Sequence, residues 1–205
     1  MVLHISASAK NPAQPPSPEP LHAIIMTLNK FIVLTIFSFL ILTTIYGQGK
    51  QDKNLTLTQI KNMFHQINDY KNYKTVTIVD AEEFLGHGTD NGGSLTGYFK
   101  NDTLKKIIEW VGLSNKVIQN EYYLDKGKLI FVYSTESRYK YNDGTQSFDY
   151  SKLNIVFKGR YYFNNDKLID TILSDKQHID TKQEDATDFL TSTKDYLKLL
   201  SAKRK

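Results

Sequence analysis

Three short segments of this 205-residue chain align without a gap, and they constrain its fold more than any other feature. They are Tyr98–Leu104, Tyr123–Leu129 and Tyr162–Leu168. Each has an aromatic residue, an apolar residue, two polar residues, then Asp or Gly, one more polar residue and Leu. The Asp or Gly stands where a tight turn requires a positive φ, which Gly adopts freely and Asp tolerates better than most residues. We therefore expect three β-hairpins with Asp102, Gly127 and Asp166 at their tips.

Helical patterns flank these hairpins. Upstream, apolar residues recur at three- and four-residue steps, as on one face of a helix: Leu57, Ile60, Met63, Phe64, Ile67 and Tyr70. Thr56 and Gln59 fit a capping box at the start of this helix, and the β-branched run Thr75–Val79 follows its end. The region 184–205 returns to helical spacing, with an apolar face of Phe189, Leu190, Thr193, Leu197 and Leu200.

These elements predict one α+β domain. We expect an antiparallel β-meander of six or seven strands, with an N-terminal and a C-terminal helix packed on the sheet. Local hairpins dominate, so strands that are neighbours in sequence should be neighbours in the sheet. Both helices should cover one sheet face. A cone-shaped helix-plus-sheet fold with a central pocket is the alternative that the same elements allow.

The first fifty residues differ in composition from the rest of the chain. All five prolines lie in residues 12–20, and Met26 then begins a segment with Lys30, an uncharged apolar run over Phe31–Tyr46 and Gly47-Gln48-Gly49. A short basic region, an apolar run and a small-x-small site are the layout of a secretory signal peptide. We therefore interpret residues 1–25 as a non-native upstream extension, 26–49 as the signal peptide and 50–205 as the domain. An uncleaved membrane anchor is the alternative.

Composition excludes several classes of function. The chain has no cysteine, which rules out disulfides, thiolate metal sites and cysteine nucleophiles. The formal net charge is +4, too small to indicate nucleic-acid binding in the absence of a basic stripe. The glycines form no phosphate-binding fingerprint, since Gly86-x-Gly88 opens no helix. We expect no cofactor and no nucleic-acid partner.

The hairpin segments carry a resemblance to known proteins. Residues 121–133, 160–169 and, more weakly, 97–107 match hairpins that read roughly YYFDNGKLIFV or RYYFNDGKLI. In this respect the chain resembles a loose class of uncharacterised exported proteins of Gram-negative bacteria. The resemblance covers about half of the domain. It implies an exported protein with a helix followed by hairpins, and it brings no catalytic residues.

One loop combines the residue types of a metal site. Residues 80–94 read DAEEFLGHGTDNGGS, and carboxylates with one histidine can bind a hard or borderline metal. The candidate metal ligands are Asp80, Glu82, Glu83, His87 and Asp90. A solvated loop that joins Phe84 to the next strand is the alternative interpretation.

Tyrosine is the other notable residue type. Tyr122–Tyr123 and Tyr161–Tyr162 are adjacent pairs within predicted strands, so one member of each pair should face each side of the sheet. An outward row of tyrosines would form an aromatic surface for a protein or a glycan. The candidates for this surface are Tyr98, Tyr122, Tyr123, Tyr161 and Tyr162. The alternative is that helices cover that face and all of these rings belong to the core.

The sequence contains no coherent set of acid, base and nucleophile, and this favours a binding or structural module over an enzyme. We expect an exported protein, periplasmic or secreted, whose partner is an envelope protein or a glycan. It would meet the membrane only through an uncleaved N-terminal segment. The alternative function is a metal-dependent or hydrolytic enzyme that uses the Asp80–Asp90 loop.

The predicted signal peptide has a direct test. If cleavage follows Gly47-Gln48-Gly49, N-terminal sequencing of the protein isolated from its native source should begin near Lys50. An intact N-terminus at Met1 would contradict both the cleavage and the assignment of Met26 as the true start.

Overall fold

The computed structural model describes residues 52–174 and 182–204, which lie in the compact unit Gln51–Lys205. The predicted upstream extension and signal peptide fall outside these residues. Within the described residues, no helix is long and apolar enough to cross a membrane. The elements are an N-terminal helix over residues 52–69, β1 (Lys74–Ile78), α2 (Ala81–Leu85), β2 (Gly93–Lys100), β3 (Thr103–Gly112), β4 (Lys116–Asp125), β5 (Lys128–Asn142), β6 (Ser147–Asn164), β7 (Lys167–Leu173) and α3 (Lys182–Lys203).

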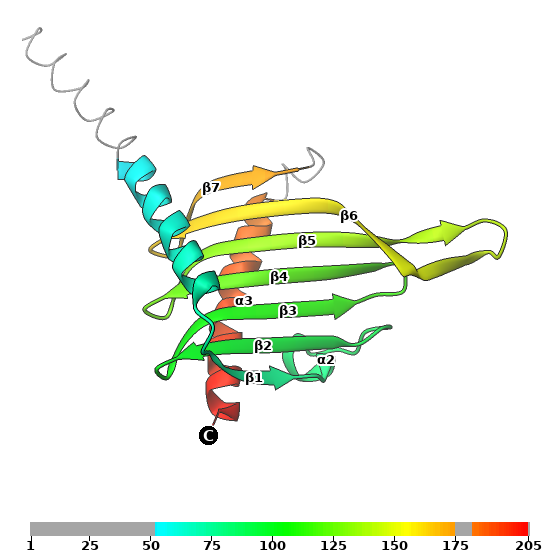
Figure 1. Cartoon of the computed structure of the whole chain (residues 1–205), viewed down its shortest axis with the longest axis horizontal. Helices are drawn as coiled ribbons and strands as arrows, with labels where there is room; N and C mark the ends of the chain where they lie inside the picture. The colour runs from blue at the N-terminus through cyan, green and yellow to red at the C-terminus, as the bar shows by residue number, and fades with distance from the viewer. Residues whose placement is uncertain (1–51, 175–181, 205) are drawn as a thin grey trace, which may run out of the picture. The chain divides into compact units, whose positions relative to one another are not determined.

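The seven strands form one antiparallel sheet in sequence order, from β1 at one edge to β7 at the other (Figure 1). This confirms the predicted α+β class and the predicted meander. Each strand pairs with the next along the chain because short turns keep consecutive strands together. The sheet is open, with β1 and β7 as its edges, so the cone-shaped alternative is not observed.

The three predicted hairpin tips are two-residue turns. Asp102, Gly127 and Asp166 have φ angles of 64°, 77° and 58°, which confirms the positive φ expected at this position. The residue before each also has a positive φ: 46° at Asn101, 49° at Lys126 and 49° at Asn165. Positive φ at both central residues defines a type I′ turn, whose twist matches that of the flanking strands.

Each of these hairpins also carries a β-bulge at the same aligned position. Leu104, Leu129 and Leu168 pair across their hairpins, and the register then shifts by one residue. The residue that follows each leucine is left without a cross-strand partner: Lys105, Ile130 and Ile169. A bulge strengthens the local twist of the sheet, so the repeat fixes both the turn and the curvature beside it.

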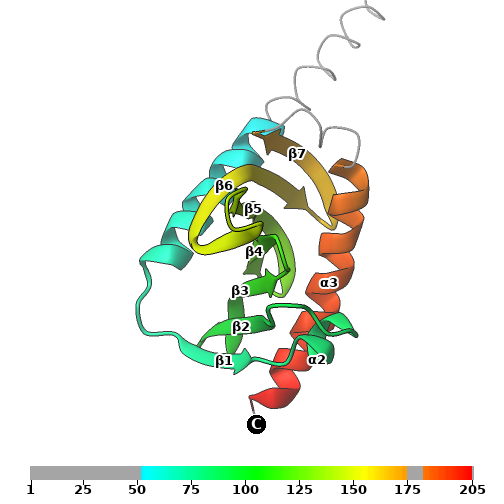
Figure 2. The same ribbon diagram turned by 90° about the vertical axis from the view of Figure 1, so that its right-hand side faces the viewer.

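The two long helices lie on opposite faces of the sheet, as Figure 2 shows edge-on. The expectation that both would cover one face was wrong. On the front face, toward the viewer in Figure 1, Ile60 and Ile67 of the N-terminal helix pack against Tyr123, Phe131 and Tyr162. On the back face, α3 packs on a larger core that includes Phe189, Tyr196, Leu200, Tyr122, Tyr161, Leu95, Ile107 and Phe163.

The reason for this two-sided arrangement lies in the repeat itself. The aromatic residue of each repeat and the apolar residue after it point to opposite faces. Tyr123 and Leu124 are 1% and 0% exposed, and Tyr162 and Phe163 are 5% and 0% exposed. Because both faces carry large apolar side chains, each needs its own cover.

Both helices differ from the prediction in detail, the first in its capping residue and α3 in its buried face. Thr56 lies inside the N-terminal helix, where its Oγ1 donates to the carbonyl oxygen of Asp52 at 2.9 Å, so it does not cap the helix start. In α3 the buried positions are Ala186, Phe189, Thr193, Tyr196 and Leu200, whereas Leu190 and Leu197 pack at the margin of the core.

The type I′ turns predict the effect of substitution at Gly127. The space beside this residue is open, since a side-chain Cβ there would meet no atom within 4 Å, so any cost of a side chain comes from the backbone. Gly127→Val should destabilise the fold by about 1–3 kcal/mol, because a β-branched residue would have to hold φ > 0. Gly127→Asn should cost less, since Asn tolerates this region. Urea denaturation measures both.

The aspartate tips provide the control. Asp166→Gly should be neutral or slightly stabilising, because Gly removes the strain at φ 58°. Asp102→Gly would change two contributions at once, because the Asp102 carboxylate also lies 3.1 Å from Arg204 Nη2 and the substitution removes this ion pair. A neutral Gly127→Val together with a destabilising Asp166→Gly would contradict the turn assignment.

Candidate functional site: a cleft beside the N-terminal helix

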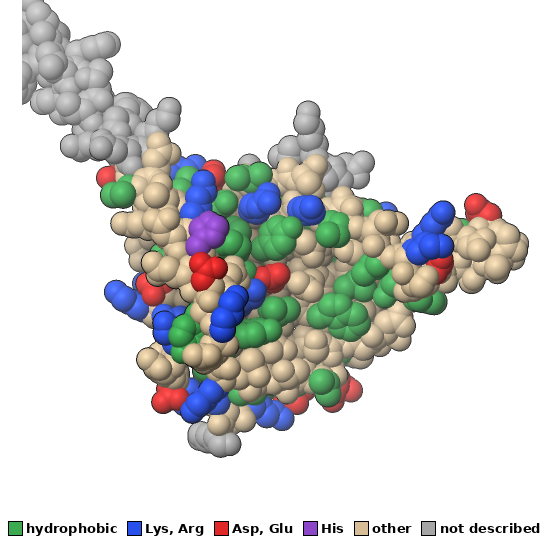
Figure 3. Space-filling view, viewed as in Figure 1, with side chains coloured by type: hydrophobic (Ala, Val, Ile, Leu, Met, Phe, Trp, Pro, Cys, Tyr) green, Lys and Arg blue, Asp and Glu red, His purple; other side chains and the backbone are tan. Residues whose placement is uncertain are grey.

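A cleft of about 260 Å³ lies between the N-terminal helix and the front face of the sheet. Figure 3 shows apolar and basic side chains gathered beside this helix on that face. The volume exceeds the ~150 Å³ of a cavity that holds one benzene molecule. The cleft is lined by Ile60, Lys61, Phe64, His65, Phe131, Tyr133, Arg160 and Tyr162.

The floor of the cleft is aromatic and closely packed. Phe131 of β5 and Tyr162 of β6 are each 5% exposed, and their ring centroids are 4.9 Å apart. Phe64 from the helix meets Phe131 edge-on at 5.4 Å. Edge-to-face and tilted contacts at these distances are favourable, so the floor is an ordered apolar surface.

The rim of the cleft is basic. Lys61 and His65 are exposed and stand one turn apart on the N-terminal helix, on the same helix side because residues four apart are neighbours. Across the cleft, the Arg160 guanidinium lies 5.5 Å from the ring centroid of Tyr133, a cation–π distance. Lys61 and His65 of the N-terminal helix and Arg160 of β6 therefore lie at the rim of an aromatic floor.

Polar contacts hold the helix against the sheet on both sides of the cleft. Near the C-terminal end of the helix, Lys106 Nζ lies 2.6 Å from Glu121 Oε2 and donates to Asn68 Oδ1 at 3.1 Å. The Tyr123 hydroxyl donates to the same Glu121 oxygen at 2.7 Å, and burial, reinforced by Glu121, raises the pKa of Tyr123 well above its ordinary value. Toward the other end of the helix, Lys53 Nζ pairs with Asp170 at 3.0 Å.

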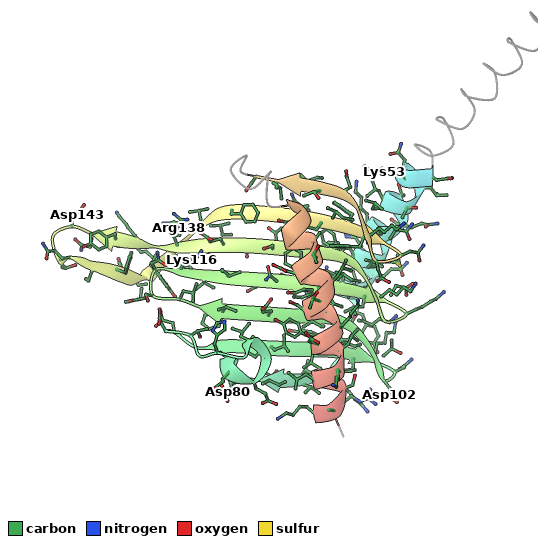
Figure 4. All side chains as sticks on the ribbon, turned by 180° about the vertical axis from the view of Figure 1, so that it is seen from behind. Lys53, Asp80, Asp102, Lys116, Arg138 and Asp143 are labelled. Carbon is green, nitrogen blue, oxygen red and sulfur yellow. The ribbon has the colours of Figure 1, made fainter. Side chains whose placement is uncertain are left out.

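The five candidate metal ligands are not brought together. Among residues 52–174 and 182–204, no three His, Cys, Asp or Glu side chains are grouped to hold a metal ion. Instead, Asp80 caps α2 by accepting from the Glu82 backbone N–H, on the side of the sheet that α3 covers (Figure 4). Glu83 Oε1 lies 2.7 Å from Lys203 Nζ.

The other loop candidates have local roles or face solvent. Asp90 accepts from the backbone N–H and the hydroxyl of Ser114, which ties the loop to the turn between β3 and β4. His87 Nδ1 is 3.0 Å from the carbonyl oxygen of Gly88, and Glu82 is exposed. The geometry therefore matches a structured connecting loop.

The tyrosine pairs belong to the core. Tyr122, Tyr123 and Tyr161 are each 1% exposed and Tyr162 is 5% exposed, so these four rings form no outward aromatic platform. Tyr98 is half-buried and meets Tyr73 edge-on at 5.8 Å. Since each face is covered by its own helix, both members of a pair find a buried environment.

A buried carboxylate lies on the back face, and nothing in the sequence pattern had marked it. Glu109 is 6% exposed. It accepts hydrogen bonds from the hydroxyls of Tyr122 and Tyr196, both at 2.7 Å, and from Asn120 Nδ2 at 2.9 Å. Burial, with the nearby Glu109, raises the pKa of both tyrosines well above the ordinary value. The Tyr196 bond joins α3 to the sheet, and the other two join β4 to β3.

Exposed apolar side chains concentrate on the long β5–β6 hairpin, which projects past the other strands away from the N-terminal helix (Figure 1). At its base, Glu136 accepts from Lys116 Nζ at 2.9 Å and from Arg138 Nε at 2.8 Å; Figure 4 labels both cations. The exposed apolar residues of this hairpin are Tyr141, Tyr150, Leu153, Ile155 and Val156.

Comparisons with protein-family models, with curated proteins and with solved structures found no match. The resemblance of the hairpins to exported Gram-negative proteins therefore stays a prediction. The function has to be argued from the cleft and from the chemistry of the residues around it.

The Glu109 cluster predicts a measurable contribution to stability. Tyr196→Phe removes the hydroxyl that donates to Glu109 Oε1 and leaves a buried carboxylate oxygen without this partner. The variant should lose about 1–3 kcal/mol of unfolding free energy, measured by urea denaturation. Tyr139→Phe is the matched control, because no hydrogen bond joins the Tyr139 hydroxyl to another described residue. Equal stability of both variants would contradict a structural role for the cluster.

Proposed function

We propose that this protein is an exported binding module that holds a small, partly apolar molecule in the cleft beside its N-terminal helix. One observation carries the proposal: an aromatic floor and a polar rim meet in a cavity of about 260 Å³. Ligand sites are typically concave, mostly apolar and fitted with a few polar groups that orient the ligand.

The lining residues favour binding over catalysis. Among the described residues, the side chains that line the cleft include no carboxylate, serine, threonine or cysteine. His65 therefore has no serine, threonine or cysteine nucleophile and no orienting carboxylate among these lining residues, so neither a triad nor a carboxylate pair is formed by them. In the Asp80–Asp90 loop, the basis of the alternative enzyme function, Asp80, Glu83 and Asp90 are engaged in capping and in contacts between elements, and Glu82 is exposed.

Export is the second part of the proposal. It is supported by the layout of residues 26–49, which has Lys30, an apolar run and Gly47-Gln48-Gly49 in the order of a signal peptide. The lack of cysteine is compatible with an exported domain of this size, since about 150 residues can bury enough surface to fold without disulfides.

The cleft can be blocked without changing the core. His65 is exposed on the helix at the cleft, and Gln66 is the exposed neighbour that does not line it. The neutral dye N-phenyl-1-naphthylamine should bind the purified protein at one saturable site. His65→Trp should weaken this binding by about tenfold or more, equivalent to about 1.4 kcal/mol, because the indole ring competes for the same apolar space. Gln66→Trp should leave it unchanged.

Dye fluorescence titration with both variants measures this difference, and circular dichroism checks that each is folded. If the dye fails to saturate, or if His65→Trp and Gln66→Trp bind it equally, the cleft is not a binding site. Tyr150→Ala on the β5–β6 hairpin, where Tyr150 is 58% exposed, serves as a control for dye bound to exposed apolar residues.

A further inference from the structure

Among the described residues, the two cations at the cleft rim, Lys61 and Arg160, have no acidic partner. In the described part of the chain, Lys61 and Arg160 form no ion pair, although eight other pairs are present there. Surface lysines and arginines are often unpaired. What distinguishes these two is that they face each other across a concave apolar site, where low-dielectric walls strengthen their combined field.

Two acids that pair across strands with cleft residues are already neutralised. Asp170 is the cross-strand partner of Tyr162, and it pairs with Lys53 at 3.0 Å. Glu121 is the cross-strand partner of Tyr133, and it pairs with Lys106 at 2.6 Å. Both carboxylates are therefore balanced by cations outside the cleft lining. Since no described carboxylate pairs with Lys61 or Arg160, their positive charge remains for a ligand.

The geometry of Arg160 suits it to an anionic group. Its guanidinium is held over the Tyr133 ring at 5.5 Å, which places a planar fork of N–H donors at the rim. Such a fork matches the two oxygens of a carboxylate and also suits a sulfonate or a phosphate. The hydroxyls of Tyr133 and Tyr162 donate to no other described residue, so they are free to take part.

We propose that the cleft selects an organic anion with an apolar or aromatic body. The anionic head would lie between Arg160 and Lys61, and the body would lie on Phe131, Phe64 and Tyr162. The cleft volume of about 260 Å³ limits the body to a ring system or a short chain. This inference rests on the proposed function, because it names the ligand class of the same site.

A matched set of three probes tests the head group alone. 2-Naphthoate, 2-naphthylmethanol and 2-naphthylmethylammonium share one ring system and differ in charge. Each is titrated against the neutral dye at low ionic strength, where electrostatic selectivity is least screened. We expect naphthoate to bind about tenfold or more tightly than the alcohol, and the ammonium compound to bind most weakly. The preference should shrink when the salt concentration rises.

Variants assign the preference to the rim. Arg160→Gln and Lys61→Gln should each reduce it severalfold while changing the affinity for the alcohol little, and Arg160→Glu should reverse it in favour of the ammonium probe. Lys194→Gln is the matched control, because Lys194 is exposed on α3 on the opposite face of the sheet. This variant loses one positive charge, as the rim variants do, but at a site far from the cleft. It should leave the preference unchanged.

The outcomes separate this inference from the proposed function. If all three probes displace the dye equally, the cleft binds ligands and the anion preference is wrong. If the preference persists in Arg160→Gln and in Lys61→Gln, or falls equally in Lys194→Gln, it comes from the net charge of the protein and the inference is overturned. If neither dye nor probe binds the folded protein, the proposed function itself fails.

Discussion

The sheet is buried on both faces at the end that carries the three type I′ turns, and the rest of the domain depends on this constraint. Each repeat supplies one large side chain to the front face and the next residue to the back face, as Tyr162 and Phe163 do. Burying one such side chain contributes roughly 1.5–3 kcal/mol. Removing either helix from the sheet would therefore expose a row of these side chains to water.

The parts of the fold that follow from local chemistry could be predicted from the sequence. Positive φ at Asp102, Gly127 and Asp166 follows from residue type alone, and it fixes the hairpins and hence the order of the meander. The bulges left no such signal, since the bulged residues are one lysine and two isoleucines and neither residue type requires a bulge. The helix placement was wrong because one sheet face was assumed to meet solvent, although the adjacent aromatic and apolar residues already indicated two buried faces.

The candidate site could not be found in this way. Its basic residues, Lys61 and Arg160, are about a hundred positions apart. Arg160 begins one of the hairpin matches, but that pattern indicates a turn and a strand and gives no reason to pair Arg160 with Lys61. The Asp80–Asp90 loop drew attention because it concentrates reactive residue types, yet Asp80 serves as a helix cap and Asp90 ties the loop to the turn after β3. Short polar side chains in loops commonly satisfy nearby backbone groups. Composition alone does not separate that use from a metal site.

The position of the cleft follows from the way the N-terminal helix is fastened. The helix is held near one end by Lys106 and Asn68 and toward the other by Lys53 and Asp170. Its apolar side chains are anchored at Ile60 and Ile67. The cleft opens between these attachments, where one wall belongs to the helix and the other to β5 and β6. A ligand that contacts both walls binds the docked helix in preference to a detached one, so binding and helix docking are coupled by mass action. In the proposed function, the polar contacts at the helix ends would therefore contribute to ligand affinity without touching the ligand.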